Sequence, residues 1–187
     1  MDEKKTVDIF YEWGQLKRVR HEGLTLAGVE HPDSVGEHSL RAAQIGFVLA
    51  HLEGYANPAE VCAMAVFHDI GECRVGDIHK IANGYIKADE ERAVREQLAP
   101  LGAAGEQIFS LWRQTECRDT PAGILAKDAD WLEMALTAKE YLEQGHAIAQ
   151  VWIDNVAKAV KTRSAQRLVK ALQKRRSTDW WQDLVRL

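Results

Sequence analysis

The sequence predicts an all-α protein that folds as a single domain. Apolar residues recur three or four positions apart, the spacing of helices, along most of the 187 residues. No stretch alternates β-branched or aromatic residues with polar ones between hairpin turns, which is the pattern of strands. Only four prolines interrupt the chain, and a chain of this length can bury one core without disulfides. We expect about six to eight helices in one domain spanning residues 1–187.

Capping signals mark the predicted helices of the first third of the chain. The first helix covers about residues 5–18, where apolar side chains stand three positions apart. A second begins near Ser34, because Glu37 three positions later completes a capping box. A third covers about residues 58–70, since Pro58 follows an asparagine and suits the first helical position.

The rest of the chain divides at glycines and prolines. Three glycines make residues 71–85 loop-like, and the next segment, 88–98, is a strongly charged predicted helix. Further helices are predicted over about 106–115 and, opening at Thr-Pro, over 121–145. A final pair covers about 147–173 and precedes a tail with two adjacent tryptophans.

Composition and charge exclude several classes of protein. The net charge is −4, so no overall basic field attracts nucleic acid. The three cysteines form no CxxC pair, which argues against a disulfide scaffold or a zinc knuckle and indicates a reducing compartment. The N-terminus is charged, unlike a signal peptide, and no stretch reaches the ~18 apolar residues of a membrane span. We therefore expect a cytoplasmic protein without a membrane partner.

One segment near the C-terminus is strongly basic. Eight basic residues and no acidic one lie between Lys158 and Arg176. Such a run could attract nucleic acid. Because apolar residues also recur in it at helical spacing, we interpret it as the solvated face of a helix that packs on its other side, and we expect no nucleic-acid partner.

The stretch AVFHDIGECRVGD gathers residues that carry chemistry. It places His68 and Asp69 side by side at the end of an apolar segment, followed by Glu72 and Asp77. Burying a carboxylate beside an imidazole is costly unless something compensates the charge. A helix C-terminus attracts a cation, and His-Asp is a mixed nitrogen and oxygen ligand pair for a divalent metal. The alternative is a core histidine beside an exposed aspartate.

Two distant residues favour the metal. His38 lies on the apolar stripe of the second predicted helix, where its ring nitrogens need partners. Asp130 lies on the core stripe of the predicted helix 121–145, and an aspartate there is rarely buried unless it is paired or bound to metal. Glu133, one turn later, is either an outer partner of the site or a surface carboxylate. Candidate ligands on three separate helices indicate one shared cation.

The order H…HD…D in GEHS, FHDIGECRVGDI and KDADWLEM resembles the HD-domain phosphohydrolases, and most of all their short 5′-deoxynucleotidase branch. The resemblance covers about residues 16–142, and we expect the C-terminal helices, 147–187, to pack on this region. It implies an HD-type helical bundle with a metal site in the middle of the helices. It also implies one divalent metal ion, whose ligands would be His38, His68, Asp69 and Asp130.

The implied reaction is the hydrolysis of deoxynucleoside 5′-monophosphates to deoxynucleoside and phosphate. A bound metal activates water and polarises the phosphoryl group. The mixed ligand set suits cobalt, manganese, zinc or iron, and the affinity order does not choose among them. Two alternatives stay open: an HD enzyme for another nucleotide, such as a nucleoside triphosphate or a cyclic dinucleotide, and a non-catalytic binding protein stabilised by metal.

The resemblance also places Glu72 and Asp77 at the active site. Glu72 follows His68 by four residues and would share its face if the helix continued by one turn. There it orients the attacking water or acts as a general base. Asp77 follows a glycine and either protonates the departing ribose oxygen or holds the substrate. The alternative for both residues is a solvated loop carboxylate.

A nucleotide substrate also requires cationic groups for its phosphate. Relatives carry an arginine a few residues after the LK of the first helix. In LKRVRHE this position holds His21, with Arg20 beside it, and Lys80 is a further candidate. Glu22 stands where bacterial relatives have a tryptophan. The resemblance finally implies a homodimer, whose interface the C-terminal tryptophans are candidates to cover.

Overall fold

The computed structural model describes residues 2–182 and 184–185. In these residues the protein is helical, and its one isolated β-bridge joins Arg20 to Ser34. The predicted all-α fold is confirmed. No helix in the described part of the chain has the length and the apolar character that crossing a membrane requires.

Eight helices of the described residues have nine residues or more. They are α1 (Glu3–Trp13), α2 (Val35–Leu52), α3 (Pro58–Phe67), α6 (Glu90–Leu98), α7 (Ala103–Cys117), α8 (Pro121–Glu143), α9 (Gln150–Ala159) and α10 (Arg163–Lys174). Three helices of one turn are α4 (Glu72–Val75), α5 (Lys80–Asn83) and α11 (Asp179–Gln182).

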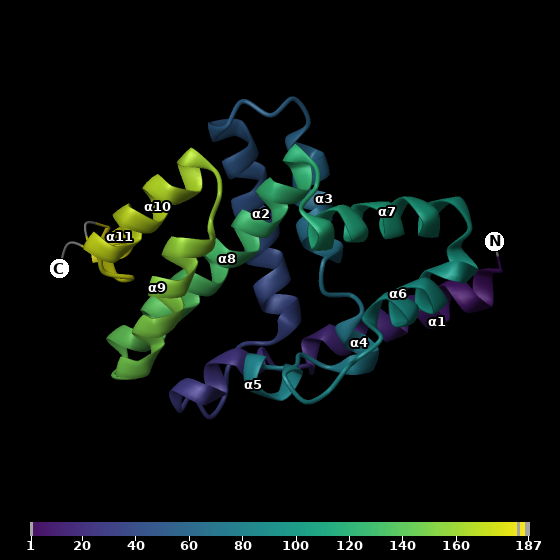
Figure 1. Cartoon of the computed structure of the whole chain (residues 1–187), viewed down its shortest axis with the longest axis horizontal. Coiled ribbons are helices and arrows are strands. Elements are labelled where there is room, and N and C mark those ends of the chain that lie inside the picture. Colours follow the sequence, from purple (N-terminus) through teal and green to yellow (C-terminus); the bar gives the residue numbers. More distant parts are fainter. Residues whose placement is uncertain (1, 183, 186–187) are drawn as a thin grey trace.

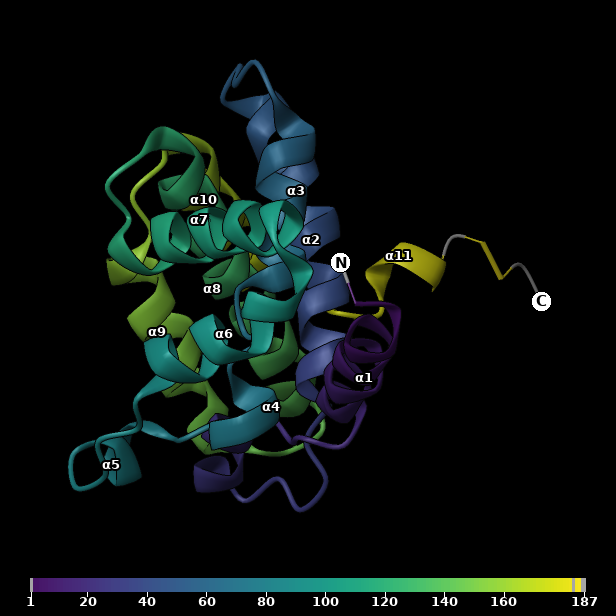
Figure 2. The same cartoon turned by 90° about the vertical axis from the view of Figure 1, so that its right-hand side faces the viewer.

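Helix α8 is the centre of the bundle. It contacts α2, α3, α7, α9 and α10, so that α9 and α10 lie on one side of it and α6 and α7 on the other (Figure 1). Two short helices stand away from this body, α5 beside the loop that precedes α6 and α11 at the C-terminal end (Figure 2). The largest apolar cluster lies where α2, α3, α8 and α10 meet.

The start of α2 agrees with its predicted capping box. The Ser34 hydroxyl accepts a hydrogen bond from the Glu37 backbone amide at 3.2 Å. The Glu37 carboxylate accepts one in return from the Ser34 amide at 2.7 Å. This reciprocal cap fixes the first turn of the helix, and His38 is the residue that follows it.

The segment after α3 is more helical than its glycines indicate. Helix α3 ends at Phe67, and α4 and α5 form within the stretch 71–85, which the sequence predicted to be loop. Helices of four residues are too short to leave a periodic pattern. Gly71 has a packing role instead, because a Cβ there would lie 2.5 Å from the Cγ of Glu90. Its missing side chain lets α4 approach α6.

A second glycine sets the contact between α7 and α8, so its replacement is expected to destabilise the fold. A Cβ on Gly123 would lie 2.1 Å from the carbonyl oxygen of Gln114. We expect Gly123→Ala to lower the free energy of unfolding by roughly 1–3 kcal/mol, since the backbones must separate. Urea denaturation followed by circular dichroism measures the loss.

The matched control is Gly14→Ala. Gly14 has a right-handed helical backbone, with φ −61°, and a Cβ there meets no atom within 4 Å. We expect this variant to keep its stability or to gain up to about 1 kcal/mol, because alanine restricts the unfolded chain. Equal stabilities of the two variants would contradict the close contact of α7 and α8.

Candidate metal centre

Four predicted ligands meet at one point inside the bundle. His38 projects from α2, His68 caps the end of α3, Asp69 follows it, and Asp130 projects from α8. The Nε2 atom of His38 lies 3.2 Å from the Nε2 atom of His68 and 3.2 Å from Oδ1 of Asp130. Oδ2 of Asp69 lies 2.9 Å from Nε2 of His68. Segments distant in the sequence thus bring two imidazoles and two carboxylates together.

Burial and charge make this point favourable for a cation. His38 and His68 are each 1% exposed, and Asp130 is 5% exposed. Burial lowers the pKa of His38, but hydrogen bonds to Asp130 and Glu133 and their charges outweigh it and raise the pKa to about 10. Burial opposes ionisation of Asp130, yet Lys127 and both imidazoles hold its pKa well below the usual range. The carboxylates therefore stabilise positive charge where the four side chains meet.

Each imidazole is oriented by a partner on its other nitrogen. The Nδ1 atom of His68 lies 2.8 Å from the carbonyl oxygen of Ala65, to which its N–H donates. The Nδ1 atom of His38 contacts the carboxylate of Glu133, which is 1% exposed. Both Nε2 atoms consequently point to the shared centre, as metal-binding histidines require. The donor set and its orientation fit a divalent ion.

Glu72 and Asp77 lie beside this centre. Atom Oε2 of Glu72 is buried, and none of the described residues donates a hydrogen bond to it. Burial, followed by the charges of Asp69 and Asp77, raises the pKa of Glu72 to about 11. Oδ2 of Asp77 accepts a hydrogen bond from the backbone amide of Glu22 at 2.6 Å. Glu72 thus keeps an unused acceptor near the candidate ligands, whereas Asp77 is anchored.

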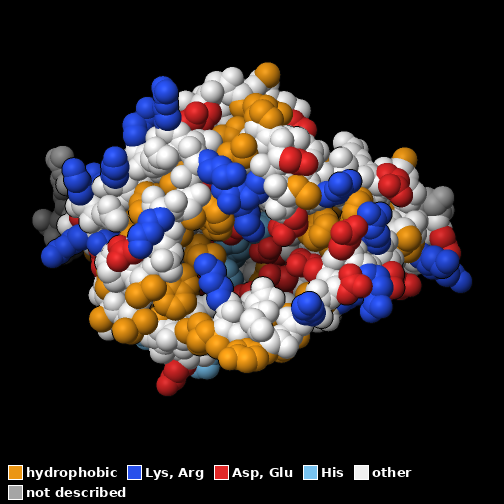
Figure 3. All heavy atoms as spheres, viewed as in Figure 1, with side chains coloured by type: hydrophobic (Ala, Val, Ile, Leu, Met, Phe, Trp, Pro, Cys, Tyr) orange, Lys and Arg blue, Asp and Glu red, His pale blue; other side chains and the backbone are white. Residues whose placement is uncertain are grey.

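A cleft of about 440 Å³, lined by Asp130 of the four candidate ligands, has the size of a small-molecule site. Its lining combines charged and aromatic residues, among them His21, Asp77, Lys80, Lys127, Trp131 and Trp152. A second hollow of about 210 Å³ shares Asp77 and Lys127 with it and adds Asp69, Glu72 and Glu90. Acidic side chains gather around a hollow near the middle of the face seen in Figure 3.

The three predicted substrate-binding residues differ in their positions. His21 lines the cleft, and the centre of its ring lies 4.4 Å from that of His38. Lys80 also lines the cleft from the first turn of α5. Arg20 does not, since its guanidinium donates a hydrogen bond to the carbonyl oxygen of Pro32 at 3.2 Å. The structure therefore brings two of the three residues to the cleft.

Two charged residues of the site were missed by the sequence analysis. The Nζ atom of Lys127 lies 2.8 Å from Oδ2 of Asp130, its partner one helical turn away. The carboxyl group of Glu90 faces Gly71, and burial followed by the charges of Glu116 and Asp69 raises its pKa to about 7. The three-residue spacing of Lys127 and Asp130 on one predicted helix could have indicated their ion pair. The position of Glu90 could not be predicted in this way, because it depends on how α6 packs.

Comparison with known proteins identifies the family of this chain. The sequence model of the HD domain matches residues 13–173. A solved structure from structural genomics that is 32% identical superposes with a TM-score of 0.81 and covers 96% of this chain and 99% of its own. A conserved hypothetical protein from Pyrococcus furiosus, 24% identical, shares the fold with a TM-score of 0.74 over 90% of this chain and 99% of its own. The chain is an HD-domain protein.

Within that family, several curated relatives are named 5′-deoxynucleotidases. The protein named 5′-deoxynucleotidase HDDC2 in Dictyostelium discoideum is 34% identical over 76% of this chain and 80% of its own length. Its counterpart of the same name in Homo sapiens is 32% identical over 89% of this chain and 83% of its own length. The chain therefore belongs to the HD-domain branch that contains the HDDC2 proteins, which the motifs in its sequence indicated.

Asp128 and Asp130 are both buried, but only Asp128 supports the C-terminal helices. Its carboxylate accepts hydrogen bonds from the amides of Lys161, at 3.0 Å, and Thr162, at 2.7 Å. We expect Asp128→Ala to lower the free energy of unfolding by roughly 1–3 kcal/mol, since it leaves two partly buried amides without their acceptor. Thermal and urea unfolding of the metal-free protein measure the loss.

The comparison variant is Asp130→Ala, which removes a candidate ligand but no backbone hydrogen bond. Cobalt binding by Asp128→Ala, measured below its unfolding transition, should stay close to the wild-type value. A loss of cobalt affinity in Asp128→Ala equal to that in Asp130→Ala would contradict the separate roles of the two aspartates.

Proposed function

We propose that this chain is a metal-dependent 5′-deoxynucleotidase that hydrolyses deoxynucleoside 5′-monophosphates to deoxynucleosides and inorganic phosphate. The observation that carries the proposal is the convergence of His38, His68 and Asp130 on one buried point beside a cleft of about 440 Å³. The names of the HDDC2 relatives supply the substrate class.

The proposed cofactor is one divalent ion held by His38, His68, Asp69 and Asp130. Nitrogen and oxygen donors in this combination suit cobalt, manganese, zinc or iron. When bound, such an ion supplies Lewis acidity, which activates water and polarises the phosphoryl group. Lys127 supports the set by holding Oδ2 of Asp130 at 2.8 Å, which leaves Oδ1 directed at the two imidazoles.

Glu72 and Asp77 are the proposed proton-transfer groups. In the metal-free protein burial raises the pKa of Glu72, and the charge of a bound divalent ion would oppose this and favour the ionised form. Oε2 of Glu72, which has no hydrogen-bond donor among the described residues, would then accept a proton from the attacking water. The water oxygen forms a bond to phosphorus, and the bond between phosphorus and O5′ breaks. Asp77, whose pKa is raised by burial, returns a proton to O5′ of the departing deoxynucleoside.

The cleft suits the two halves of a nucleotide. Lys80 and Lys127 offer ammonium groups to the phosphate, with His21 as an additional donor. The indole rings of Trp131 and Trp152 provide apolar walls for the sugar and the base. Cationic and aromatic side chains in one cleft favour a small nucleotide as substrate.

Phosphate release from deoxynucleotides tests this proposal. Purified protein with cobalt or manganese should release phosphate from dAMP, dGMP or dTMP, and prior removal of metal with EDTA should abolish the release. Adding the metal back should restore it. Ribonucleotides, a nucleoside triphosphate and a cyclic dinucleotide belong in the same panel. Activity that persists without metal, or pyrophosphate as the product, would contradict the proposed reaction.

Two variants separate the proposed ligands from the general fold. Asp69→Ala should lower kcat by at least about 100-fold, because it removes a ligand. Glu72→Gln should lower kcat by about 10²–10⁴-fold while cobalt binding persists, because it removes only a proton acceptor. Circular dichroism verifies that both variants are folded. A Glu72→Gln enzyme with wild-type kcat would exclude the base role.

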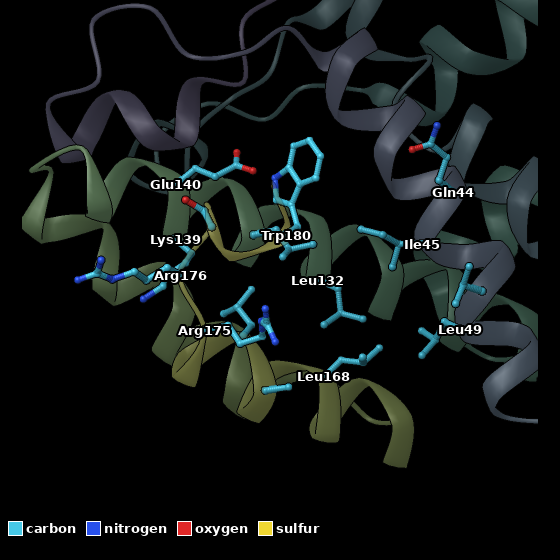
Figure 4. Close-up of a pocket in the computed structure, with 15 residues that line it drawn as sticks. Gln44, Ile45, Leu49, Leu132, Lys139, Glu140, Leu168, Arg175, Arg176 and Trp180 are labelled. Carbon is cyan, nitrogen blue, oxygen red and sulfur yellow. The ribbon is translucent and has the colours of Figure 1, made fainter. Parts of the chain in front are cut away.

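We further propose a homodimer in the reducing environment of the cytoplasm, where the three free cysteines stay reduced. A groove of about 610 Å³ runs between α2, α8 and α10. Ile45, Leu132, Leu168 and Trp180 face it (Figure 4), and Trp180 is 72% exposed. Exposed apolar side chains gathered along one groove make it the candidate interface with a second copy of this chain.

A charge on this face should dissociate the dimer. Val48 lines the groove and is 55% exposed. We expect Val48→Asp to convert the protein from dimer to monomer in analytical ultracentrifugation, since the charge would be buried in the interface. Tyr85→Asp is the control, because Tyr85 is exposed beside α5, outside the groove. A monomeric wild-type protein would contradict this part of the proposal.

A further inference from the structure

The carboxylate of Glu133 lies on the far side of His38 from the candidate ligands. One oxygen contacts Nδ1 of His38. The other accepts hydrogen bonds from Nε of Arg41 and from the hydroxyl of Thr137, each at 2.8 Å. Glu133 is 1% exposed, and His38, Arg41 and Thr137 are the described residues whose side chains satisfy its carboxylate.

Arg41 connects this buried carboxylate to the surface. It lies one helical turn after His38 on α2, and 36% of its side chain is exposed. Its Nη1 atom donates to the carboxylate of Glu140 at 2.8 Å. These groups line an open hollow of about 310 Å³ on the outside of the bundle. The guanidinium of Arg41 contacts Glu133, Thr137 and Glu140.

We propose that Glu133 and Arg41 form an outer pair that sets the affinity and geometry of metal binding by fixing the ring of His38. The inference rests on the proposed metal centre and goes beyond it, because it gives a role to two residues outside the four proposed ligands. Glu133 is a positioning residue for His38, and Arg41 is a positioning residue for Glu133.

The physical argument concerns charge and direction. A carboxylate on Nδ1 keeps the proton of a neutral imidazole on that nitrogen and leaves the lone pair of Nε2 for the metal. An ionised carboxylate as deeply buried as Glu133 is costly unless a cation accompanies it. Arg41 supplies that cation with donors in a fixed geometry. Without Arg41, the carboxylate of Glu133 would form hydrogen bonds with other donors or take up a proton. Either change would leave the imidazole of His38 without its fixed orientation.

The other imidazole provides an internal contrast. His68 is oriented by the carbonyl oxygen of Ala65, which belongs to the backbone and carries no net charge. A carboxylate makes the imidazole a stronger electron donor than a carbonyl does. The two histidines of the centre are therefore unequal, and His38 is the one whose strength as a ligand depends on replaceable side chains.

The test is a titration of the metal-free protein with Co²⁺, followed by its visible absorption spectrum and by calorimetry. Glu133→Gln keeps the size of the side chain and removes its charge. We expect its Kd for Co²⁺ to rise by about 10- to 100-fold, with an altered spectrum, as is typical when an outer partner of a metal-bound histidine is lost. Arg41→Gln should raise Kd in the same direction by about 10-fold.

Glu140→Gln is the matched control. It removes the partly exposed partner of Arg41, whose side chain is 41% exposed, and leaves the contact between Arg41 and Glu133 in place. We expect Kd within about twofold of the wild type, because exposed ion pairs contribute little. Unfolding of each metal-free variant shows whether the fold is kept, and Arg41→Gln carries the test if Glu133→Gln does not fold.

The outcomes separate this inference from the proposed function. Wild-type Co²⁺ affinity and spectrum in Glu133→Gln or, where that variant does not fold, in Arg41→Gln would overturn the inference and leave the metal centre intact. An equal loss of Co²⁺ affinity in Glu140→Gln and Arg41→Gln would also overturn the inference, because the affinity would then depend on charge at the surface and not on the contact between Arg41 and Glu133. A wild-type protein that binds no Co²⁺ would overturn the metal centre itself, and this inference with it.

Discussion

The close approach of α2, α3 and α8 is the constraint on which the rest of the structure depends. Gly46 lies two turns after His38 on α2, and a Cβ there would stand 3.2 Å from Cγ1 of Val61 and 3.5 Å from Cβ of Ala129. Larger side chains at this crossing would force the three backbones apart. Asp130 directly follows Ala129 in the chain. The close packing of Gly46 against Ala129 therefore also fixes the distance between His38 and Asp130. Packing thus determines whether the donor atoms can share one ion.

The second determinant is the balance of charge around that crossing. Asp69, Glu72, Asp77 and Glu90 surround one side of the centre, and Lys127 is the cation that lines both hollows beside them. Each acid differs in the partners that surround it. Neighbouring positive groups hold the pKa of Asp130 well below its usual range. Oε2 of Glu72 has no hydrogen-bond donor among the described residues, and Oδ2 of Asp77 accepts a hydrogen bond from the backbone amide of Glu22. Carboxylates of one chemical type can therefore take different parts in one reaction.

The sequence predicts those features that depend on local order along the chain. The capping box at Ser34 and the long helix after Thr120 are local, and the structure has both. Features that depend on which helices pack against each other cannot be predicted from local sequence order. Helical spacing places Glu90 on one face of its helix but does not reveal that this face meets Gly71. Arg20 and His21 are neighbours in the sequence. Arg20 turns away from the cleft because its backbone pairs with Ser34 and its guanidinium donates a hydrogen bond to the carbonyl oxygen of Pro32.

The environment of the two histidines shows how such a centre can be adjusted without a change of ligands. The partner of His68 is a backbone carbonyl group, which no substitution removes while the helix persists. The partner of His38 is Glu133, and the partner of Glu133 is Arg41, which reaches the surface of the molecule. Residues at these two positions can vary while all four donor atoms are retained. A bundle that fixes one imidazole by its backbone and the other by side chains therefore keeps the site in place and leaves its affinity for metal open to change.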